Sequence, residues 1–208
     1  MLGPVEFIAY IADATDVADK YNVDAHMYAD DGQMLASCRP DVVSDARRRV
    51  SNSTADFISY TASRRLQHNT DKTEAMWVGS KCSLHKLSGQ DTTLTVGTET
   101  IHPVTAVRDL GVWLDSELSL KRQVAKVASA CFYQLRRLRQ LRRRVGREVT
   151  TRLVLALFIS RLDYCNSVYA GLPDCTLNLL LRVQNALARL IFQLKPRDHI
   201  SSCQTCLQ

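Results

Sequence analysis

The chain has 208 residues, 46% of them hydrophobic, which is enough for one large domain or two small ones with a packed core. Its seven cysteines are odd in number and scattered, which argues against a secreted disulfide framework. No apolar run reaches the length of a membrane span, and Glu6 interrupts an N-terminus that would make a poor signal peptide. We therefore expect a soluble, intracellular protein without a membrane partner, in the nucleus or the cytoplasm.

The positive charge is concentrated in one region. The formal net charge is +6, yet the segment from Lys121 to Arg152 holds 11 Lys or Arg and the single acid Glu148, a local +10. Subtracting this segment from the whole chain leaves −4 for everything else. A basic surface confined to one region predicts an anionic partner there.

The first elements centre on two adjacent carboxylates. Residues 5–11 carry apolar residues at helical spacing, and the runs 23–27 and 33–37 predict two strands around Tyr28-Ala29-Asp30-Asp31. A hairpin turn would place Asp30 and Asp31 at one edge of a sheet, where a divalent cation relieves their repulsion, as in two-metal phosphoryl transfer. The alternative is an acidic hairpin turn, because Asp and Gly favour turns.

The next segment predicts a mixed pattern of helix and strand. Pro40 and Asp41 can start a helix that continues at helical spacing to about Leu66. Residues 73–78 then predict a strand, residues 94–96 and 100–101 a hairpin, and residues 107–114 a further strand. Trp77 and Trp113 fall in these strands, so we expect both in the core rather than on a base-stacking surface.

Three helices are predicted after Asp115. The first has an apolar seam at steps of three and four and ends at Val145-Gly146; the seam residues are Leu120, Val124, Val127, Cys131, Leu135, Leu138 and Leu141. Helices over about 148–169 and 173–194 follow, and short loops predict a bundle. The opposite face of the first helix carries six arginines, namely Arg136, Arg137, Arg139, Arg142, Arg143 and Arg144. This face is either merely solvated or a phosphate-binding surface, and the absence of any intervening acid favours phosphate.

Taken in order, several motifs resemble the reverse transcriptase of non-LTR retrotransposons, the LINE-like elements. The motifs are Leu2-Gly3-Pro4 with Phe7, Tyr28-Ala29-Asp30-Asp31, Asn69 with Lys72-Thr73-Glu74, Leu110-Gly111-Val112 with Asp115, and the helices of 118–199. The resemblance implies an α+β fold: a partial polymerase palm over 1–117, with an antiparallel sheet and packed helices, and a helical thumb over 118–199. We expect residues 200–208 to be a disordered tail.

The resemblance also implies roles for individual residues. Asp30 and Asp31 would bind Mg²⁺ or Mn²⁺, and Lys72 would lie near the leaving pyrophosphate, although it is equally well explained as a solvated lysine. Tyr28 would pack under the hairpin. Leu110 and Gly111 would hold the primer, and the arginine face would contact the hybrid of RNA template and DNA primer. The implied reaction is RNA-templated addition of deoxynucleotides to a primer 3′ end.

The sequence departs from such a polymerase in ways that bear on activity. It begins at the Leu-Gly-Pro motif, so the upstream metal-binding aspartate and the fingers region are expected to be missing, and metal binding should be weak. Glu6 replaces an apolar residue, which predicts an exposed helix end. The fragment should be inactive alone; the alternatives are a noncatalytic nucleic-acid-binding relic and a non-functional product of a decayed element. Cys203 and Cys206 lack a second pair and make a poor zinc site.

Overall fold

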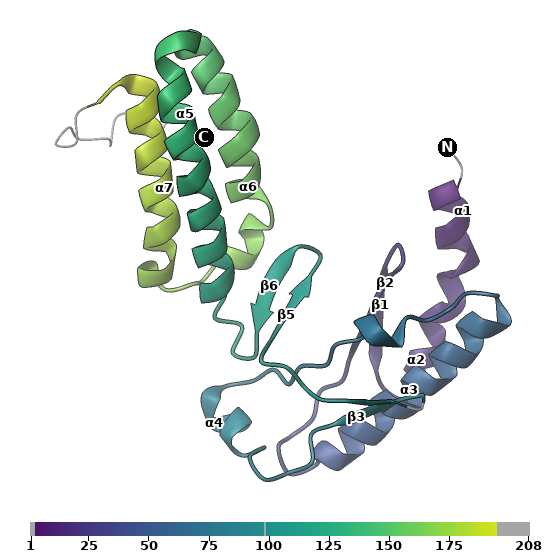
Figure 1. Ribbon diagram of the computed structural model, residues 1–208. Coiled ribbons are helices and arrows are strands. Elements are labelled where there is room, and N and C mark those ends of the chain that lie inside the picture. The colour runs from purple at the N-terminus through teal and green to yellow at the C-terminus, as the bar shows by residue number, and fades with distance from the viewer. Residues whose placement is uncertain (1–2, 98, 195–208) are drawn as a thin grey trace. The chain divides into compact units, whose positions relative to one another are not determined.

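The computed structural model describes residues 3–97 and 99–194, and it is a mixed α+β fold with small antiparallel sheets, as expected (Figure 1). The chain forms two compact units, residues 1–107 and residues 108 onward. The division therefore precedes the position expected from the sequence, residue 117. The reason is that Val112 belongs to the hydrophobic core of the second unit.

The first unit consists of short elements around one long helix. Its helices are α1 (Gly3–Tyr10), α2 (Asp16–Asp19), α3 (Val43–Ser63) and α4 (Lys81–His85), with 3₁₀ turns at Ala12–Ala14 and Thr70–Lys72. Its strands are β1 (Asp24–Tyr28), β2 (Asp31–Leu35), β3 (Leu94–Val96) and β4 (Glu99–Ile101). In the described residues these strands form separate two-stranded antiparallel hairpins.

The β1–β2 hairpin rests on a small apolar core. Met27 and Met34 project from the hairpin onto a cluster of Ile11, Ala14 and Phe57. Alternation along a strand points their neighbours the other way, toward solvent. The core under this hairpin therefore depends on two flexible methionine side chains and a few residues of the preceding helices and α3.

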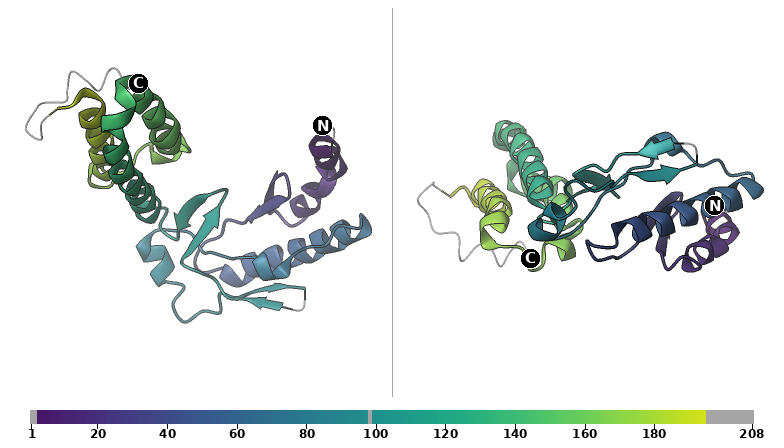
Figure 2. Two further views of the ribbon diagram at one scale, coloured as in Figure 1. Left: turned by 45° about the horizontal axis from the view of Figure 1, so that its top comes forward. Right: turned by 90° about the horizontal axis from the view of Figure 1, so that it is seen from below.

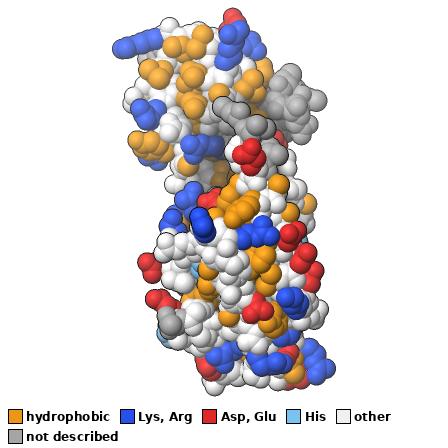
Figure 3. Space-filling view, turned by 90° about the vertical axis from the view of Figure 1, so that its right-hand side faces the viewer, with side chains coloured by type: hydrophobic (Ala, Val, Ile, Leu, Met, Phe, Trp, Pro, Cys, Tyr) orange, Lys and Arg blue, Asp and Glu red, His pale blue; other side chains and the backbone are white. Residues whose placement is uncertain are grey.

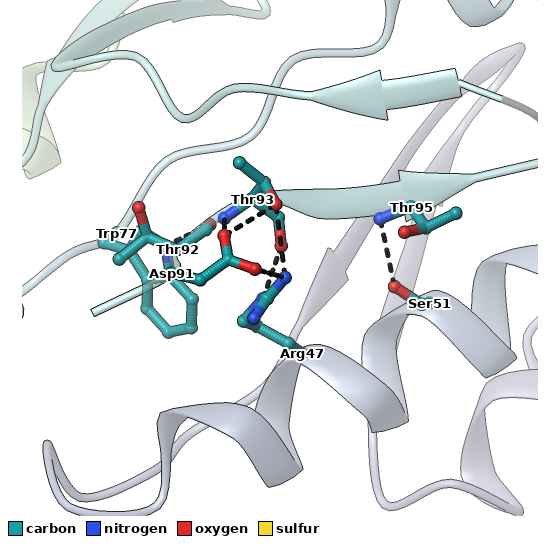
Figure 4. Close-up of polar contacts among 7 residues, drawn as sticks. All are labelled: Arg47, Ser51, Trp77, Asp91, Thr92, Thr93 and Thr95. Atoms are coloured by element: carbon teal, nitrogen blue, oxygen red, sulfur yellow. Dashed lines mark hydrogen bonds and ion pairs between the residues drawn. The ribbon is translucent and has the colours of Figure 1, made fainter.

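Helix α3 is tied to the loop before β3 by a polar cluster (Figure 4). Arg47 donates from Nε to the Thr93 carbonyl oxygen at 2.5 Å, and its Nη2 lies 2.6 Å from Asp91 Oδ2. Trp77 donates from Nε1 to the Thr92 carbonyl oxygen at 3.0 Å, so this indole is half-buried with its polar atom paired. Arg47 therefore holds the loop before β3 on α3, because it donates to a backbone carbonyl oxygen and pairs with an aspartate of that loop.

The strand expected over residues 73–78 is absent. This segment is extended, and the Ala75 carbonyl oxygen accepts a hydrogen bond from Val104 N at 2.8 Å. The neighbouring residue, Pro103, has no N–H to donate. A single hydrogen bond beside a proline does not form the ladder of backbone hydrogen bonds that defines a strand. The prediction of a strand over residues 73–78, which rested on the sequence pattern alone, is therefore wrong.

The second unit begins with a hairpin where one strand was predicted. Strands β5 (Ala106–Asp109) and β6 (Val112–Asp115) pair across a two-residue turn, Leu110-Gly111. Leu110 has φ 42° and Gly111 has φ 85°, and positive φ at both positions is what a type I′ turn requires. The turn reverses the chain in the middle of the predicted strand 107–114.

A three-helix bundle follows, as predicted (Figures 1 and 2). Helix α5 (Lys121–Val154) breaks at Gly146, whose φ of 72° and ψ of 178° suit only glycine, so we call residues 121–145 the first arm. The second arm runs through a π-helical segment (Leu155–Ile159) and α6 (Ser160–Asp163), and a 3₁₀ turn (Asn166–Tyr169) leads to α7 (Asp174–Phe192). The expected stop at Val145-Gly146 is confirmed.

The bundle encloses the larger core of the molecule. Val124, Cys131, Leu135 and Leu138 on the first arm pack with residues of the second arm and α7, among them the fully buried Phe158. Burial raises the pKa of the Cys131 thiol, opposed by the charge of Arg161. The seam prediction fails only at its end, because Leu141 is 49% exposed.

Candidate nucleic-acid interface

The arginine face predicted on α5 is present on the first arm. Arg136, Arg137, Arg139 and Arg144 are exposed. Among the residues that the structure describes, none of these four has a hydrogen-bond or ion-pair partner. In the first unit, by contrast, ion pairs with aspartates involve five arginines, namely Arg39, Arg47, Arg48, Arg49 and Arg64. These four arginines of the first arm are therefore available to an external anion.

One of the six arginines differs from the prediction, and a second is not tested. Arg142 is half-buried, and its Nε is inaccessible without a hydrogen-bond partner. The buried positions 124, 128, 131, 135 and 138 alternate in steps of four and three, so the next seam position is 142 rather than 141. Arg142 thus lies at the end of the seam, not on the opposite face. The side chain of Arg143 lies outside the described part of the chain.

The turn with Leu110 and Gly111 is held by the bundle. Tyr164, just after α6, donates from its hydroxyl group to the Leu110 carbonyl oxygen at 2.6 Å. A Cβ atom on Gly111 would lie 3.8 Å from the Tyr164 ring, an ordinary contact distance. The predicted primer-holding residues therefore form a fixed turn packed on a tyrosine within the second unit.

A cation–aromatic stack between β6 and α5 was missed by the sequence analysis. The guanidinium carbon of Arg122 lies 3.7 Å from the centre of the Trp113 ring, and Lys126 Nζ lies 5.0 Å from it. Trp113 is half-buried, and its backbone N–H donates to Gln123 Oε1 at 3.1 Å. The i, i+4 spacing of the two cations was visible in the sequence, but their contact with Trp113 depends on tertiary structure.

Asp115 fixes the loop that leads into α5. Its carboxylate accepts hydrogen bonds from the backbone N–H groups of Glu117, Ser119 and Leu120 at 3.2, 2.9 and 2.9 Å. Partial burial raises the pKa of Asp115, but the hydrogen bonds from Ser119, Leu120 and Glu117 outweigh it and leave the pKa below its ordinary value. Leu118 and Leu120 adopt positive φ, a conformation that costs a leucine about 1–2 kcal/mol. The carboxylate hydrogen bonds hold these residues in place and so set where α5 begins.

The hairpin around Asp30 and Asp31 is confirmed. Strands β1 and β2 are antiparallel, Tyr28 faces Asp31 in register, and Ala29 and Asp30 form the turn, with Ala29 at φ 55°. A Cβ on Gly32 would lie 2.9 Å from Met27 Sδ, so a larger residue there would require the methionine side chain to shift. Both aspartates are exposed, and neither carboxylate has a partner in the described residues. Tyr28 is 69% exposed, which corrects the expectation that it packs under the hairpin.

The remaining predicted site residues are not brought together. Lys72 ends the 3₁₀ turn Thr70–Lys72, is exposed, and makes no hydrogen bond or ion pair with Asp30 or Asp31. Within residues 3–97 and 99–194, no group of three or more His, Cys, Asp or Glu side chains is arranged to hold a metal ion. Glu6 is exposed, as expected. The predicted tail 200–208, with Cys203 and Cys206, lies outside the described residues.

Comparison of the chain with protein-family models, curated proteins and solved structures finds no match. In the described ranges, no helix has the length and apolar character needed to cross a membrane.

Proposed function

We propose that this chain is a nucleic-acid-binding segment related to non-LTR retrotransposon reverse transcriptases, with a palm remnant in the first unit and a thumb in the second. The observation that carries the proposal is the first arm of α5. It exposes Arg136, Arg137, Arg139 and Arg144 on a helix that has no acidic residue between Lys121 and Gly146. Guanidinium groups suit phosphate oxygens, so the proposed partner is a polynucleotide backbone. The resemblance to reverse transcriptases implies that this backbone is that of an RNA–DNA hybrid.

The charge of the surroundings supports this assignment. In the first unit, basic and acidic side chains are interspersed over the face drawn in Figure 3, and several arginines are neutralised by aspartates. Among the described residues, Arg136, Arg137, Arg139 and Arg144 on the first arm of α5 have no such ion pair, whereas Arg152 beyond Gly146 pairs with Glu148. Binding to phosphates releases condensed counterions, which favours association and carries no base preference. The segment should therefore bind with little sequence specificity.

The carboxylate hairpin supplies two ligands for a metal. Asp30 and Asp31 are adjacent, exposed and unpaired in the described residues, and carboxylate oxygens suit Mg²⁺ or Mn²⁺. When bound, the metal would offset negative charge on a triphosphate and on a primer 3′ oxygen. The two aspartates would orient that ion at the hairpin tip. Two carboxylates make a weak site, so polynucleotide binding should not require the metal.

The salt dependence of binding tests the proposal. We expect the full chain to bind an RNA–DNA hybrid, with log Kd changing against log salt with a slope of magnitude about 3–5 if four to six phosphates are engaged. The triple variant Arg136→Gln, Arg137→Gln, Arg139→Gln should flatten the slope by about 3, while Gln maintains helix propensity. Fluorescence anisotropy at several salt concentrations measures both.

A matched control separates local contacts from overall charge. Lys20, Arg65 and Lys86 are exposed cations of the first unit, and changing all three to Gln removes the same charge. This control should keep the parental slope. Salt-independent binding by the original chain, or equal slopes for the α5 triple variant and the parent, would show that the arginine face is only solvated.

The alternative function is catalysis of DNA synthesis, favoured by the hairpin geometry of Asp30 and Asp31 alone. We expect no template-dependent primer extension in Mg²⁺ or Mn²⁺, because two carboxylates without a third acidic ligand hold the metal weakly. Extension on an RNA template, compared with the Asp30→Ala variant, is the measurement. Incorporation that disappears in the variant would establish a polymerase and overturn this expectation.

A further inference from the structure

The end of helix α3 forms an open cavity that the proposed function does not use. The chain leaves α3 after Ser63 and turns back toward the 3₁₀ turn Thr70–Lys72, and a cavity of about 350 Å³ lies along this return (Figure 1). Its lining comes entirely from residues 58–70 of the first unit. This volume is at the lower end of the range for small-molecule sites, about 300–1,000 Å³. The cavity is therefore the size of a small ligand rather than of a polynucleotide.

One part of the lining is apolar. Ile58 and Ala62 are four residues apart and so lie on the same side of α3, and Leu66 adds a third apolar side chain after the helix ends. Leu66 also packs against the apolar cluster that contains Phe57, so the core of the first unit supports this part of the lining. A flat apolar group would lose its contact with water against these three side chains, which favours its binding.

Arg65 lines the cavity from a position that ordinarily holds glycine. Leu66 N–H donates to the Thr61 carbonyl oxygen at 2.9 Å, and Arg65 N–H donates to the Ala62 carbonyl oxygen at 2.9 Å. These two hydrogen bonds form a Schellman helix end, in which Arg65, with φ 59°, adopts the left-handed conformation that favours glycine. Its side chain is exposed and has no hydrogen-bond or ion-pair partner in the described part of the chain. Strained backbone positions of this kind are concentrated at ligand and active sites.

The other polar side chains of the lining can donate hydrogen bonds. His68 Nε2 lies 3.0 Å from Thr73 Oγ1, and this contact orients the imidazole ring beside the cavity. Gln67 is exposed and makes no hydrogen bond among the described residues, so its amide nitrogen can donate to an anion. Thr70 adds a hydroxyl group. None of the described residues that line the cavity is acidic. The polar part of the lining therefore combines one permanent positive charge with hydrogen-bond donors.

We propose that this cavity binds a small planar carboxylate, with its rings against the apolar part of the lining and its carboxylate group on Arg65. Guanidinium and carboxylate groups form paired, charge-assisted hydrogen bonds, and Gln67 can donate one more. A polyphosphate fits less well, because a single guanidinium group cannot neutralise several phosphate groups. The inference does not depend on the proposed nucleic-acid function, because no residue of the cavity belongs to the arginine face of α5.

Amide chemical shifts of the full chain, measured by NMR during titration with naphthoate, test the inference. We expect saturable shifts centred on residues 58–70. Naphthamide is a neutral analogue with the same rings, and acetate carries the charge without the rings. Each should bind at least about tenfold more weakly than naphthoate, because each lacks one of the two contacts. This comparison of three ligands uses the unaltered chain, so it does not depend on the stability of any variant.

Two variants separate the charge from the apolar surface. Arg65→Gln should weaken naphthoate binding about tenfold and naphthamide binding less than about twofold. Ala62→Leu should weaken both by about tenfold or more, because the larger side chain occupies the cavity, while leucine keeps the helix propensity of α3. Lys86→Gln removes an exposed cation elsewhere in the first unit and should change neither affinity.

Three results would overturn the inference. Absence of saturable shifts over residues 58–70 would show that the cavity holds only solvent. Equal affinities for naphthoate and acetate would show that the apolar lining takes no part. Unchanged naphthoate affinity in Arg65→Gln would show that the guanidinium group does not hold the carboxylate. Arg65→Gln should also keep the parental salt slope for an RNA–DNA hybrid, so the failure of carboxylate binding and the failure of hybrid binding are read separately.

Discussion

Each of the two units of this chain is stabilised by a different kind of interaction. The second unit has one contiguous core in which side chains such as Phe158, Leu135 and Leu187 are almost completely inaccessible. The first unit has a small cluster around Phe57, and its loops are fastened to helix α3 by arginines that donate to backbone carbonyl oxygens. The stabilisation from apolar burial changes little with salt concentration or acid, whereas the stabilisation from charged hydrogen bonds and ion pairs is more sensitive to both. The comparison predicts that the second unit is more stable than the first.

The difference matches the proposed division of function. A helix that presents a row of cations to a phosphate backbone needs a rigid support, and the bundle core supplies it by fixing the seam of α5. The carboxylate hairpin of the first unit rests on Met27 and Met34, two flexible side chains. We therefore expect nucleic-acid binding to persist under conditions that loosen the hairpin.

The largest expected effect comes from the bundle core. Phe158→Ala removes a fully buried ring and should lower the free energy of unfolding of the second unit by about 3–5 kcal/mol. Urea titrations followed by Trp113 in a Trp77→Phe background report on that unit. Titrations followed by Trp77 in a Trp113→Phe background should show an unchanged first unit. Equal shifts of both transitions would contradict the idea of two separately stabilised units.

The bundle and the hairpins were predictable because their signals are local. The seam of α5 alternates in steps of three and four, and Gly146 marks its break; Asp30 and Gly32 mark the β1–β2 turn. Leu141 was misplaced because a step of three and a step of four from the last buried position both fit a helical seam. In the folded bundle the step of four is used, and it falls on Arg142. The strand over 73–78 failed because pairing depends on a partner segment, which contains Pro103.

The site was predictable only in part. A run of arginines without acids is a composition feature, so the α5 face could be found without the fold. The stack of Arg122 and Lys126 on Trp113 could not, because residues nine and thirteen positions from the tryptophan meet it only after the hairpin and the helix pack together. The sequence marked Asp115 only as part of a motif. The hydrogen bonds that its carboxylate accepts from three backbone N–H groups could not be predicted, because they depend on the left-handed residues in the loop.

Removing the Asp115 carboxylate should have the next largest effect. Asp115→Ala leaves three backbone N–H groups without their acceptor and removes the hydrogen bonds that offset the strain at Leu118 and Leu120, so we expect a loss of about 2–3 kcal/mol from the second unit. The same urea titration on Trp113 fluorescence measures it. A loss below about 0.5 kcal/mol would mean that water replaces the carboxylate without penalty.

The pH dependence sharpens this prediction. The folded-state pKa of Asp115 is lowered, so its stabilising effect is complete above the unfolded pKa of about 3.9 and is lost as pH falls through the folded pKa. The difference in stability between the parent and Asp115→Asn should therefore shrink as pH is lowered from about 6 to below about 3. A difference that stays constant over this range would show that charge is not the cause.

A smaller effect is expected from removing the polar contacts of Arg47 in the first unit. Arg47→Leu retains apolar contact but removes the donors to Thr93 and Asp91, which should cost the first unit about 1–2 kcal/mol. The Trp77 transition should move while that of Trp113 does not. Arg48→Leu, which removes an exposed ion pair with Asp45, is the matched control and should change little. Equal effects of the two variants would argue against a special role for Arg47.

The smallest effect should come from the tyrosine that holds the β5–β6 turn. Tyr164→Phe removes one hydrogen bond to the Leu110 carbonyl oxygen, and because Leu110 is 37% exposed, water can replace the lost donor. We expect about 0.5–1 kcal/mol, within the range of a single neutral hydrogen bond. Amide hydrogen exchange should accelerate in the hairpin and hardly at all in the bundle core.

Gly111→Ala tests the backbone of the same turn. Its φ of 85° strains any L residue, whereas the added Cβ would make an ordinary contact with Tyr164 at 3.8 Å. If the backbone conformation dominates, Gly111→Ala will loosen the turn more than Tyr164→Phe does; the reverse order would show that the tyrosine hydroxyl group, rather than the turn residues, fixes the β5–β6 turn.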